Sequence, residues 1–204
     1  MTSQEFNDYV KSQQPVIEQI RLLAYSVHDH VNQTYDKVHP YGFHLDMVVS
    51  ALRKYGSEVC QSERDVLPLF FGAFFHDSIE DARLSYNDVK KYALRFMDEE
   101  QAFMAAEIVY ALTNDKGRTR AERAGEKYYA GIRETPYAPF VKLCDRDANI
   151  TYSFKNVNAA NARMKGVYHD EQPLFLKAIN AHSDDPRQGL PQEMIDEMDK
   201  LMNA

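Results

Sequence analysis

An apolar segment that ends in a cluster of charged residues is the feature that most constrains this chain. Residues 67–75, Leu-Pro-Leu-Phe-Phe-Gly-Ala-Phe-Phe, are apolar on every side. Such a segment is typical of an element surrounded by others, and we interpret it as a central helix, although periodicity alone leaves a buried strand open. The residues that follow directly, 76–81, contain one imidazole and three carboxylates. The fold must therefore place these polar groups next to its core.

The polar side chains of this segment share one face if the helix continues. At about 100° per residue, positions 76, 77, 80 and 81 fall within about 140° of one another. Burial of an imidazole and carboxylates without partners is costly, and a divalent cation is the simplest compensation. A solvated, charged helix end is the alternative interpretation.

Helical periodicity also dominates the rest of the sequence. Apolar residues recur at three- and four-residue spacing from Val16 to Val27, after Pro15, which suits the first turn of a helix. We predict further helices at about 43–55, 85–94 with Ser85 as N-cap, 99–113, 119–133, 138–153, 156–181 with an interruption near Pro173, and 190–202. The prediction is an all-α, single-domain bundle of about eight to ten helices over residues 1–204, with residues 184–204 forming a C-terminal loop and helix.

Composition argues against two kinds of partner. The hydrophobic fraction of 44% and the charged fraction of 27% are those of a globular protein, and no apolar run has the length of a membrane span. A net charge of −7 argues against binding to duplex nucleic acid. The first residues do not resemble a signal peptide, and Cys60 and Cys144 lack metal-finger spacing. We expect a reduced, cytoplasmic protein, and the sequence leaves its oligomeric state open.

Two other segments carry residues that can bind a metal ion. His44 opens an amphipathic helix, where its imidazole could point into a pocket, and a histidine of this kind is otherwise packed or exposed. Asp145 directly follows a mostly apolar run, and Asn149 lies one helical turn further on. The remaining histidines are interpreted as structural or surface residues: His28, His30, His39, His169 and His182.

The order and spacing of these segments resemble the HD superfamily of metal phosphohydrolases. More narrowly, the chain is similar to the hydrolase domain of the RelA/SpoT family and to stand-alone small alarmone hydrolases, including the metazoan SpoT homologue type. The matching motifs are Pro40-Tyr41-x-x-His44, His76-Asp77-x-x-Glu80-Asp81, Thr113-Asn114-Asp115-Lys116 and Val141-Lys142-Leu143-x-Asp145-Arg146-x-x-Asn149. The resemblance implies an HD-type helical fold for most of the chain.

The resemblance also implies a metal cofactor and a pair of catalytic carboxylates. The family holds one divalent ion, usually Mn²⁺, and the corresponding residues here are His44, His76, Asp77 and Asp145. Glu80 and Asp81 match the pair that orients and deprotonates the attacking water. This role is physically reasonable, because a nearby carboxylate can accept the proton of a metal-activated water.

The candidate substrate-binding residues come partly from the resemblance and partly from local charge. The family contacts the nucleoside at the positions of Tyr41 and Asn149. The segment 116–134 contains six basic residues and only three glutamates, Glu122, Glu126 and Glu134. Such a segment suits a pyrophosphate, and an amphipathic helix with intrahelical ion pairs is the alternative. The further candidates for substrate binding are Lys37, Tyr35, Lys142, Lys116, Arg118 and Tyr152.

Two of these positions depart from the family pattern. RelA/SpoT hydrolases usually carry an arginine that packs on guanine at the position of Tyr35, and a threonine at the position of Tyr152. The resemblance implies hydrolysis of a phosphorylated nucleotide, with a (p)ppGpp 3′-pyrophosphohydrolase as the leading hypothesis. The alternatives are an HD-type 5′-nucleotidase, a dNTP triphosphohydrolase or an NADPH phosphatase and, from another class, a non-catalytic nucleotide-binding module.

Overall fold

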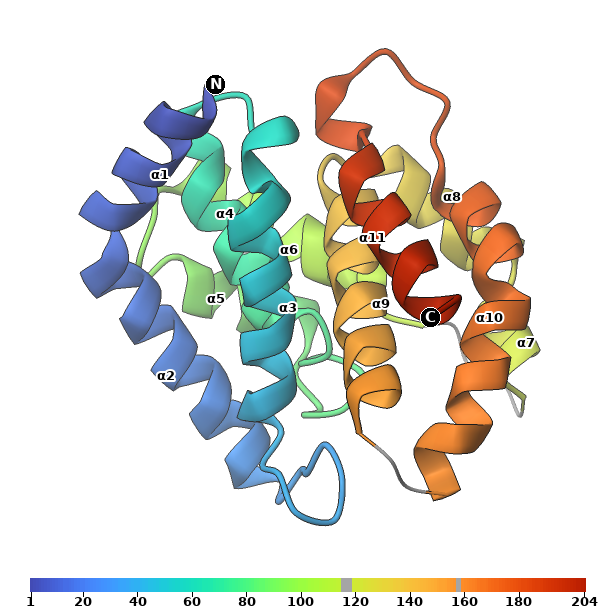
Figure 1. The fold of residues 1–204 in the computed structure, drawn as a ribbon. Coiled ribbons are helices and arrows are strands. Elements are labelled where there is room, and N and C mark those ends of the chain that lie inside the picture. Colours follow the sequence, from blue (N-terminus) through green and yellow to red (C-terminus); the bar gives the residue numbers. More distant parts are fainter. Residues whose placement is uncertain (115–118, 157–158) are drawn as a thin grey trace.

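Several helices of the N-terminal half begin with a capping box. The computed structural model describes residues 1–114, 119–156 and 159–204 (Figure 1). Capping boxes at Thr2, Ser85 and Asp98 satisfy backbone N–H groups at the starts of α1, α5 and α6. The helices of this half are α1 (Ser3–Ser12), α2 (Gln14–His30), α3 (Gly42–Tyr55), α4 (Glu63–Phe75), α5 (Tyr86–Ala93) and α6 (Glu99–Leu112).

The C-terminal half is also helical. It contains α7 (Arg120–Arg123), α8 (Glu126–Glu134), α9 (Ala138–Lys155), α10 (Ala159–Ile179) and α11 (Gln192–Met202). Two 3₁₀ helices, η1 (Gly56–Glu58) and η2 (Pro186–Gln188), complete the elements. Within the described ranges, the β structure is limited to an isolated bridge between Thr34 and Pro40. The predicted all-α fold is confirmed.

The apolar segment 67–75 forms the buried C-terminal part of α4. All of its residues are buried, and Leu69, Phe70 and Phe71 have 0% exposure. The element is a helix, which removes the alternative of a buried strand, and it packs against α2, α3 and α6. None of the helices in the described part of the chain has the length and apolarity needed to cross a membrane.

The packing of α3, α4 and α9 positions the predicted metal-binding residues. Helices α3 and α9 lie side by side near the centre of the view in Figure 1, and α4 contacts both. His44 lies in the first turn of α3, His76 directly follows α4, and Asp145 lies in α9. The three helices therefore bring together residues that are far apart in the sequence.

Some helix boundaries differ from the prediction for clear physical reasons. Helix α1 was not predicted because it buries only Phe6 and Val10, too few residues to give a periodic signal. The predicted helix at 119–133 is two helices, α7 and α8, because the backbone of Gly125 is extended at φ −81° and ψ 178°. The predicted interruption near Pro173 was wrong, since α10 runs through it. Pro173 and His169 are both exposed, so water can reach the carbonyl that loses its partner.

A side chain at Gly72 would collide with the neighbouring helix α6. A Cβ there would lie 2.6 Å from Cγ2 and 3.2 Å from Cβ of Ile108. We predict that Gly72→Ala lowers the free energy of unfolding by up to about 2 kcal/mol, because an overpacking cost of about 1–3 kcal/mol outweighs the gain in helix propensity of about 1 kcal/mol. Chemical denaturation measures the change. Gly131→Ala in α8 is the control, since nothing lies within 4 Å of its Cβ, and equal effects of the two substitutions would contradict the collision.

Candidate metal centre

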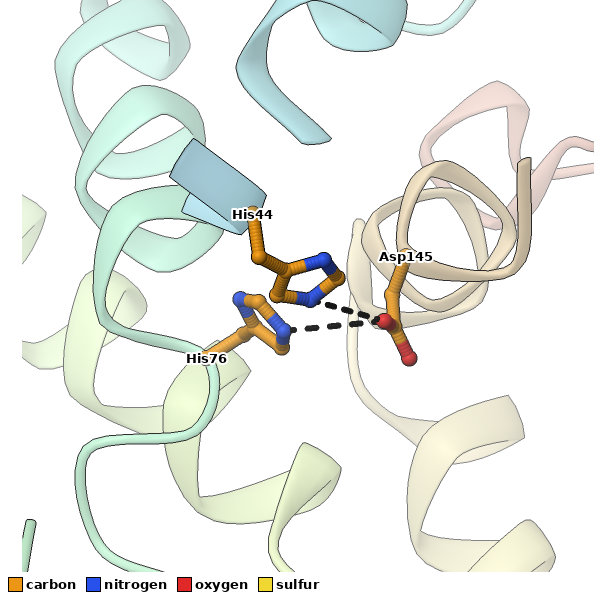
Figure 2. A group of neighbouring side chains, drawn as sticks. All are labelled: His44, His76 and Asp145. Carbon is orange, nitrogen blue, oxygen red and sulfur yellow. Dashed lines mark ion pairs between the residues drawn. The ribbon is translucent and has the colours of Figure 1, made fainter. Parts of the chain in front are cut away.

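Side chains from three separate segments converge on one point next to the core. The potential ligand atoms of His44, His76 and Asp145 all lie within 4.8 Å of one another. Figure 2 shows both imidazoles directed at Asp145, with distances to its Oδ1 of 3.2 Å from Nε2 of His44 and 3.8 Å from Nε2 of His76. Two imidazole nitrogens and a carboxylate oxygen in this arrangement can bind a metal ion.

Asp77 brings a further carboxylate to the same point. Its Oδ2 lies 2.8 Å from Nε2 of His76 and 3.9 Å from Nε2 of His44, and it accepts a hydrogen bond from the hydroxyl of Tyr41. The side chains of His44 and His76 are 2% and 1% exposed, whereas those of Asp77 and Asp145 are 19% and 13% exposed. The four residues predicted to bind metal therefore lie together, with the carboxylates on the solvent side.

The chain leaves the helical path directly after α4. Helix α4 ends at Phe75, and residues 76–81 form consecutive turns in which the N–H of Ser78 donates to the carbonyl of Phe75 at 2.9 Å. The N–H of Asp81 donates to the carbonyl of Asp77 at 2.8 Å. The condition under which the four polar side chains would share one helical face, a continuation of α4, is therefore not met. The turns direct the polar side chains to different neighbours.

Glu80 and Asp81 are held by amide side chains from other segments. Oε2 of Glu80 accepts a hydrogen bond of 2.7 Å from the side chain of Asn114, which follows α6. Oδ2 of Asp81 accepts one of 2.8 Å from the side chain of Gln33, which follows α2. Burial and the charge of Asp77 raise the pKa of Asp81. Asp81 is therefore a better proton acceptor than an exposed aspartate.

The imidazole of His76 is oriented for metal binding. Its Nδ1 lies 2.8 Å from the carbonyl oxygen of Ala73, which can only accept, so Nδ1 carries a proton and Nε2 is the nitrogen that faces the carboxylates. Nε2 is buried, and Oδ2 of Asp77 lies 2.8 Å from it. Burial disfavours a charged imidazole, but the carboxylates of Asp77 and Asp145 raise the pKa of His76 to about 9. The electrostatics that favour a proton on Nε2 also favour a divalent cation there.

Asp145 is kept ionised by neighbours on the same face of α9. Burial alone would raise the pKa of its carboxyl, but the ammonium of Lys142 holds that pKa well below its usual range. Nζ of Lys142 donates to Oδ2 at 2.9 Å, and Nδ2 of Asn149 donates to Oδ1 at 2.7 Å. Lys142 was predicted to bind phosphate, and the structure pairs it with this carboxylate.

A cavity of about 690 Å³ opens beside Asp145, within the usual size range of small-molecule sites. Its lining joins the metal centre to α8 and α10. Polar lining residues include Glu80, Asn114, Arg123, Lys142 and Asn149. Aromatic and apolar lining residues include Tyr128, Tyr129, Leu174 and Phe175. The mixture of cationic, polar and aromatic groups suits a nucleotide.

The other predicted substrate-binding residues occupy different environments. Tyr35 is stacked on the imidazole of His44, and Tyr152 meets the ring of Tyr35 edge to face. Tyr41 is buried, and Lys37 is exposed in the loop before α3. Lys116 and Arg118 lie outside the described residues. In the rest of the basic segment Arg123 lines the cavity, whereas Arg133 pairs with Glu126, so both interpretations of this segment apply in part.

Sequence reasoning missed the residues that reach the centre from the loop between α2 and α3. Gln33 bonds to Asp81, and Asp36 accepts hydrogen bonds from the hydroxyl of Tyr152 and from Nδ1 of His39. These contacts are made by a polar loop without hydrophobic periodicity. Their partners lie in other segments, so no local pattern in the sequence could indicate them.

Comparisons with known proteins agree with this fold. No family model matches the sequence, and no curated protein matches it. Five chains of solved structures match, and one of them has a TM-score of 0.61 and 18% sequence identity, covering 92% of this chain and 94% of that chain. That protein is a metazoan ortholog of SpoT that hydrolyses ppGpp and plays a role in starvation responses. At this level of identity the likeness shows the fold, so the predicted HD-type fold is confirmed.

We predict that His76→Ala lowers the affinity for Mn²⁺ by at least about 100-fold. Substitution of a residue that only orients a metal ligand lowers metal affinity by about 10- to 100-fold, and loss of a ligand itself should cost at least the upper value. Calorimetric titration of the metal-free protein measures the dissociation constant. His169→Ala is the control, since this histidine is 59% exposed and also lies beside a carboxylate, that of Asp170. Binding by His76→Ala that equals wild type would show that the centre is assigned wrongly.

Proposed function

We propose that this protein is a metal-dependent phosphohydrolase of a phosphorylated nucleotide, with (p)ppGpp cleaved at the 3′ position as the leading substrate. The observation that carries the proposal is a buried cluster of two imidazoles and two carboxylates at the wall of a nucleotide-sized cavity. The shared fold with a protein that hydrolyses ppGpp supports it. Intact catalytic carboxylates beside the cluster favour an enzyme over a non-catalytic nucleotide-binding module.

His44, His76, Asp77 and Asp145 would hold one divalent ion. Their two nitrogen and two oxygen donors suit Mn²⁺, whereas the thiols of Cys60 and Cys144 are buried and free. When bound, such an ion lowers the pKa of water and offsets negative charge on phosphoryl oxygens. The buried Nε2 of His76 lies between the carboxylates of Asp77 and Asp145, and this arrangement fits a divalent cation.

Asp81 acts as the general base in this proposal. Its raised pKa lets it take a proton from the attacking water, and Gln33 fixes the orientation of its carboxylate. Glu80 is exposed, lines the cavity and is held by Asn114, so it can orient the same water. The water oxygen forms the new bond to phosphorus, the bond from phosphorus to the leaving oxygen breaks, and Asp81 receives the proton.

The remaining cavity supplies recognition of the nucleotide. Arg123 presents a guanidinium that suits a phosphate group, and Tyr129 with Leu174 offers an apolar wall for a base or sugar. Tyr35 replaces the arginine that the family uses on guanine. Because that arginine is missing, guanine specificity is not implied. The alternative activities are therefore those of a 5′-nucleotidase, a dNTP triphosphohydrolase and an NADPH phosphatase.

A turnover screen with Mn²⁺ over ppGpp, pppGpp, NADPH, dNTPs and nucleoside monophosphates tests the proposal. Release of pyrophosphate from ppGpp or pppGpp is the expected result. Phosphate from NADPH or a monophosphate, or triphosphate from a dNTP, would assign the site to the corresponding alternative. Nucleotide binding without turnover of any compound would favour the non-catalytic module.

We predict that Asp81→Asn and Glu80→Gln each lower kcat by about 100-fold or more while leaving the dissociation constant for Mn²⁺ unchanged. General acid–base groups contribute effects of about this size, and neither side chain is among the proposed ligands. Glu193→Gln is the control because it removes an exposed carboxylate on α11. Wild-type rates in both site variants would refute the proposed handling of the water.

A further inference from the structure

We propose that Tyr35 is a positioning residue for the metal centre, in which its ring orients His44 and its hydroxyl orients Asp145 through Asn149. This inference rests on the proposed metal centre. Tyr35 lies in the loop between α2 and α3, whereas Asn149 and Asp145 lie on α9. The sequence suggested a substrate contact for Tyr35, and the geometry points to the metal-binding side chains themselves.

The ring of Tyr35 takes the place of a missing hydrogen bond at His44. The two rings are stacked, with centroids 4.8 Å apart and planes within 6°. Nδ1 of His44 is buried and has no hydrogen-bond partner among the described residues. In metal-binding histidines, the ring nitrogen that does not bind the metal normally donates a hydrogen bond that orients the ring. Nδ1 of His76 makes such a bond with the carbonyl of Ala73. At His44 the flat face of Tyr35 restrains the imidazole instead.

The hydroxyl of Tyr35 begins a hydrogen-bonded chain that ends at a metal-binding oxygen. It donates to Oδ1 of Asn149 at 2.9 Å. Nδ2 of Asn149 then donates to Oδ1 of Asp145 at 2.7 Å and to the carbonyl of Asp145 at 2.9 Å. The same Oδ1 is the atom nearest to Nε2 of His44, at 3.2 Å. Tyr35 therefore contacts one proposed ligand directly and holds a second through one amide.

Tyr35 is itself fixed by the residues around it. Its N–H donates to the carbonyl of His39 at 3.1 Å, and the bridge between Thr34 and Pro40 closes the loop on either side. Its ring meets Tyr152 edge to face at 4.9 Å. A side chain held in this way can transmit its position to the ligands.

The test is calorimetric titration of the metal-free protein with Mn²⁺ alone, which does not depend on the substrate. Tyr35→Phe keeps the stacked ring and loses the hydroxyl, so we expect its dissociation constant to rise about tenfold, the lower end of the range for supporting residues. Tyr35→Leu loses both contacts and should bind still more weakly. Tyr86→Phe is the matched control, because it also loses one tyrosine hydroxyl bond, that to Glu107 at 2.7 Å.

A double-mutant cycle separates positioning from a general structural role. Asn149→Ala breaks the same series of hydrogen bonds. In the Asn149→Ala background, Tyr35→Phe should therefore raise the dissociation constant for Mn²⁺ by much less than the tenfold expected for Tyr35→Phe in the wild-type protein. Additive losses, or a dissociation constant for Tyr35→Phe equal to wild type, would overturn the proposal. Thermal melting of Tyr35→Phe checks that the variant is folded. If its Mn²⁺ affinity falls only because the protein unfolds, the proposal is also overturned.

The outcomes also separate this proposal from the proposed function. Wild-type protein that does not bind Mn²⁺ would refute the metal centre and both proposals with it. Wild-type binding that Tyr35→Phe leaves unchanged, with a raised KM for substrate, would assign Tyr35 to substrate binding and leave the function standing. Weaker Mn²⁺ binding in Tyr35→Phe supports positioning even if none of the nucleotides is hydrolysed.

Discussion

The rest of the site depends on two carboxylates held between two buried imidazoles. Helix α4 is buried along its apolar segment, so the residue that ends it, His76, is 1% exposed and cannot turn to water. Asp77 and Asp145 both approach this imidazole and that of His44. The two carboxylates repel each other in this poorly solvated position, and the loss of their hydration adds to the free-energy cost of bringing them together. Lys142 offsets part of that cost at Asp145, and a divalent cation would offset most of the remainder.

Neighbouring groups fix each side chain of the candidate metal centre in a different way. A backbone carbonyl orients His76, and the hydroxyl of Tyr41 bonds to Asp77. A lysine and an asparagine on one face of α9 orient Asp145. A ligand set held so firmly loses little conformational freedom when metal binds, which raises affinity. The loop between α2 and α3 contributes through Gln33 and Tyr35, so its closed conformation is part of the site rather than a simple connection.

Sequence patterns predicted the elements with strong periodicity and the residues in dense motifs. The buried helix at 67–75 and the N-cap at Ser85 were predicted because each depends on residues close in sequence. The turns after Phe75 were not, because the same residues could continue a helix and only packing against the rest of the fold decides. The relay from Tyr35 to Asn149 joins residues 114 positions apart. This hydrogen bond forms because the loop between α2 and α3 lies beside α9 in the folded protein, and a single sequence does not show that contact.

The charge balance of the centre links metal and substrate. Within the described residues Lys142 is the cation hydrogen-bonded to the centre, whereas Asp77, Asp81 and Asp145 bring three carboxyl groups to it. Tyr35 adds no charge at the position where the sequence resemblance leads us to expect an arginine. Under the proposed function, these carboxylates would disfavour a phosphorylated nucleotide until a divalent ion offsets their charge. If the proposed function holds, nucleotide affinity should therefore depend on metal occupancy.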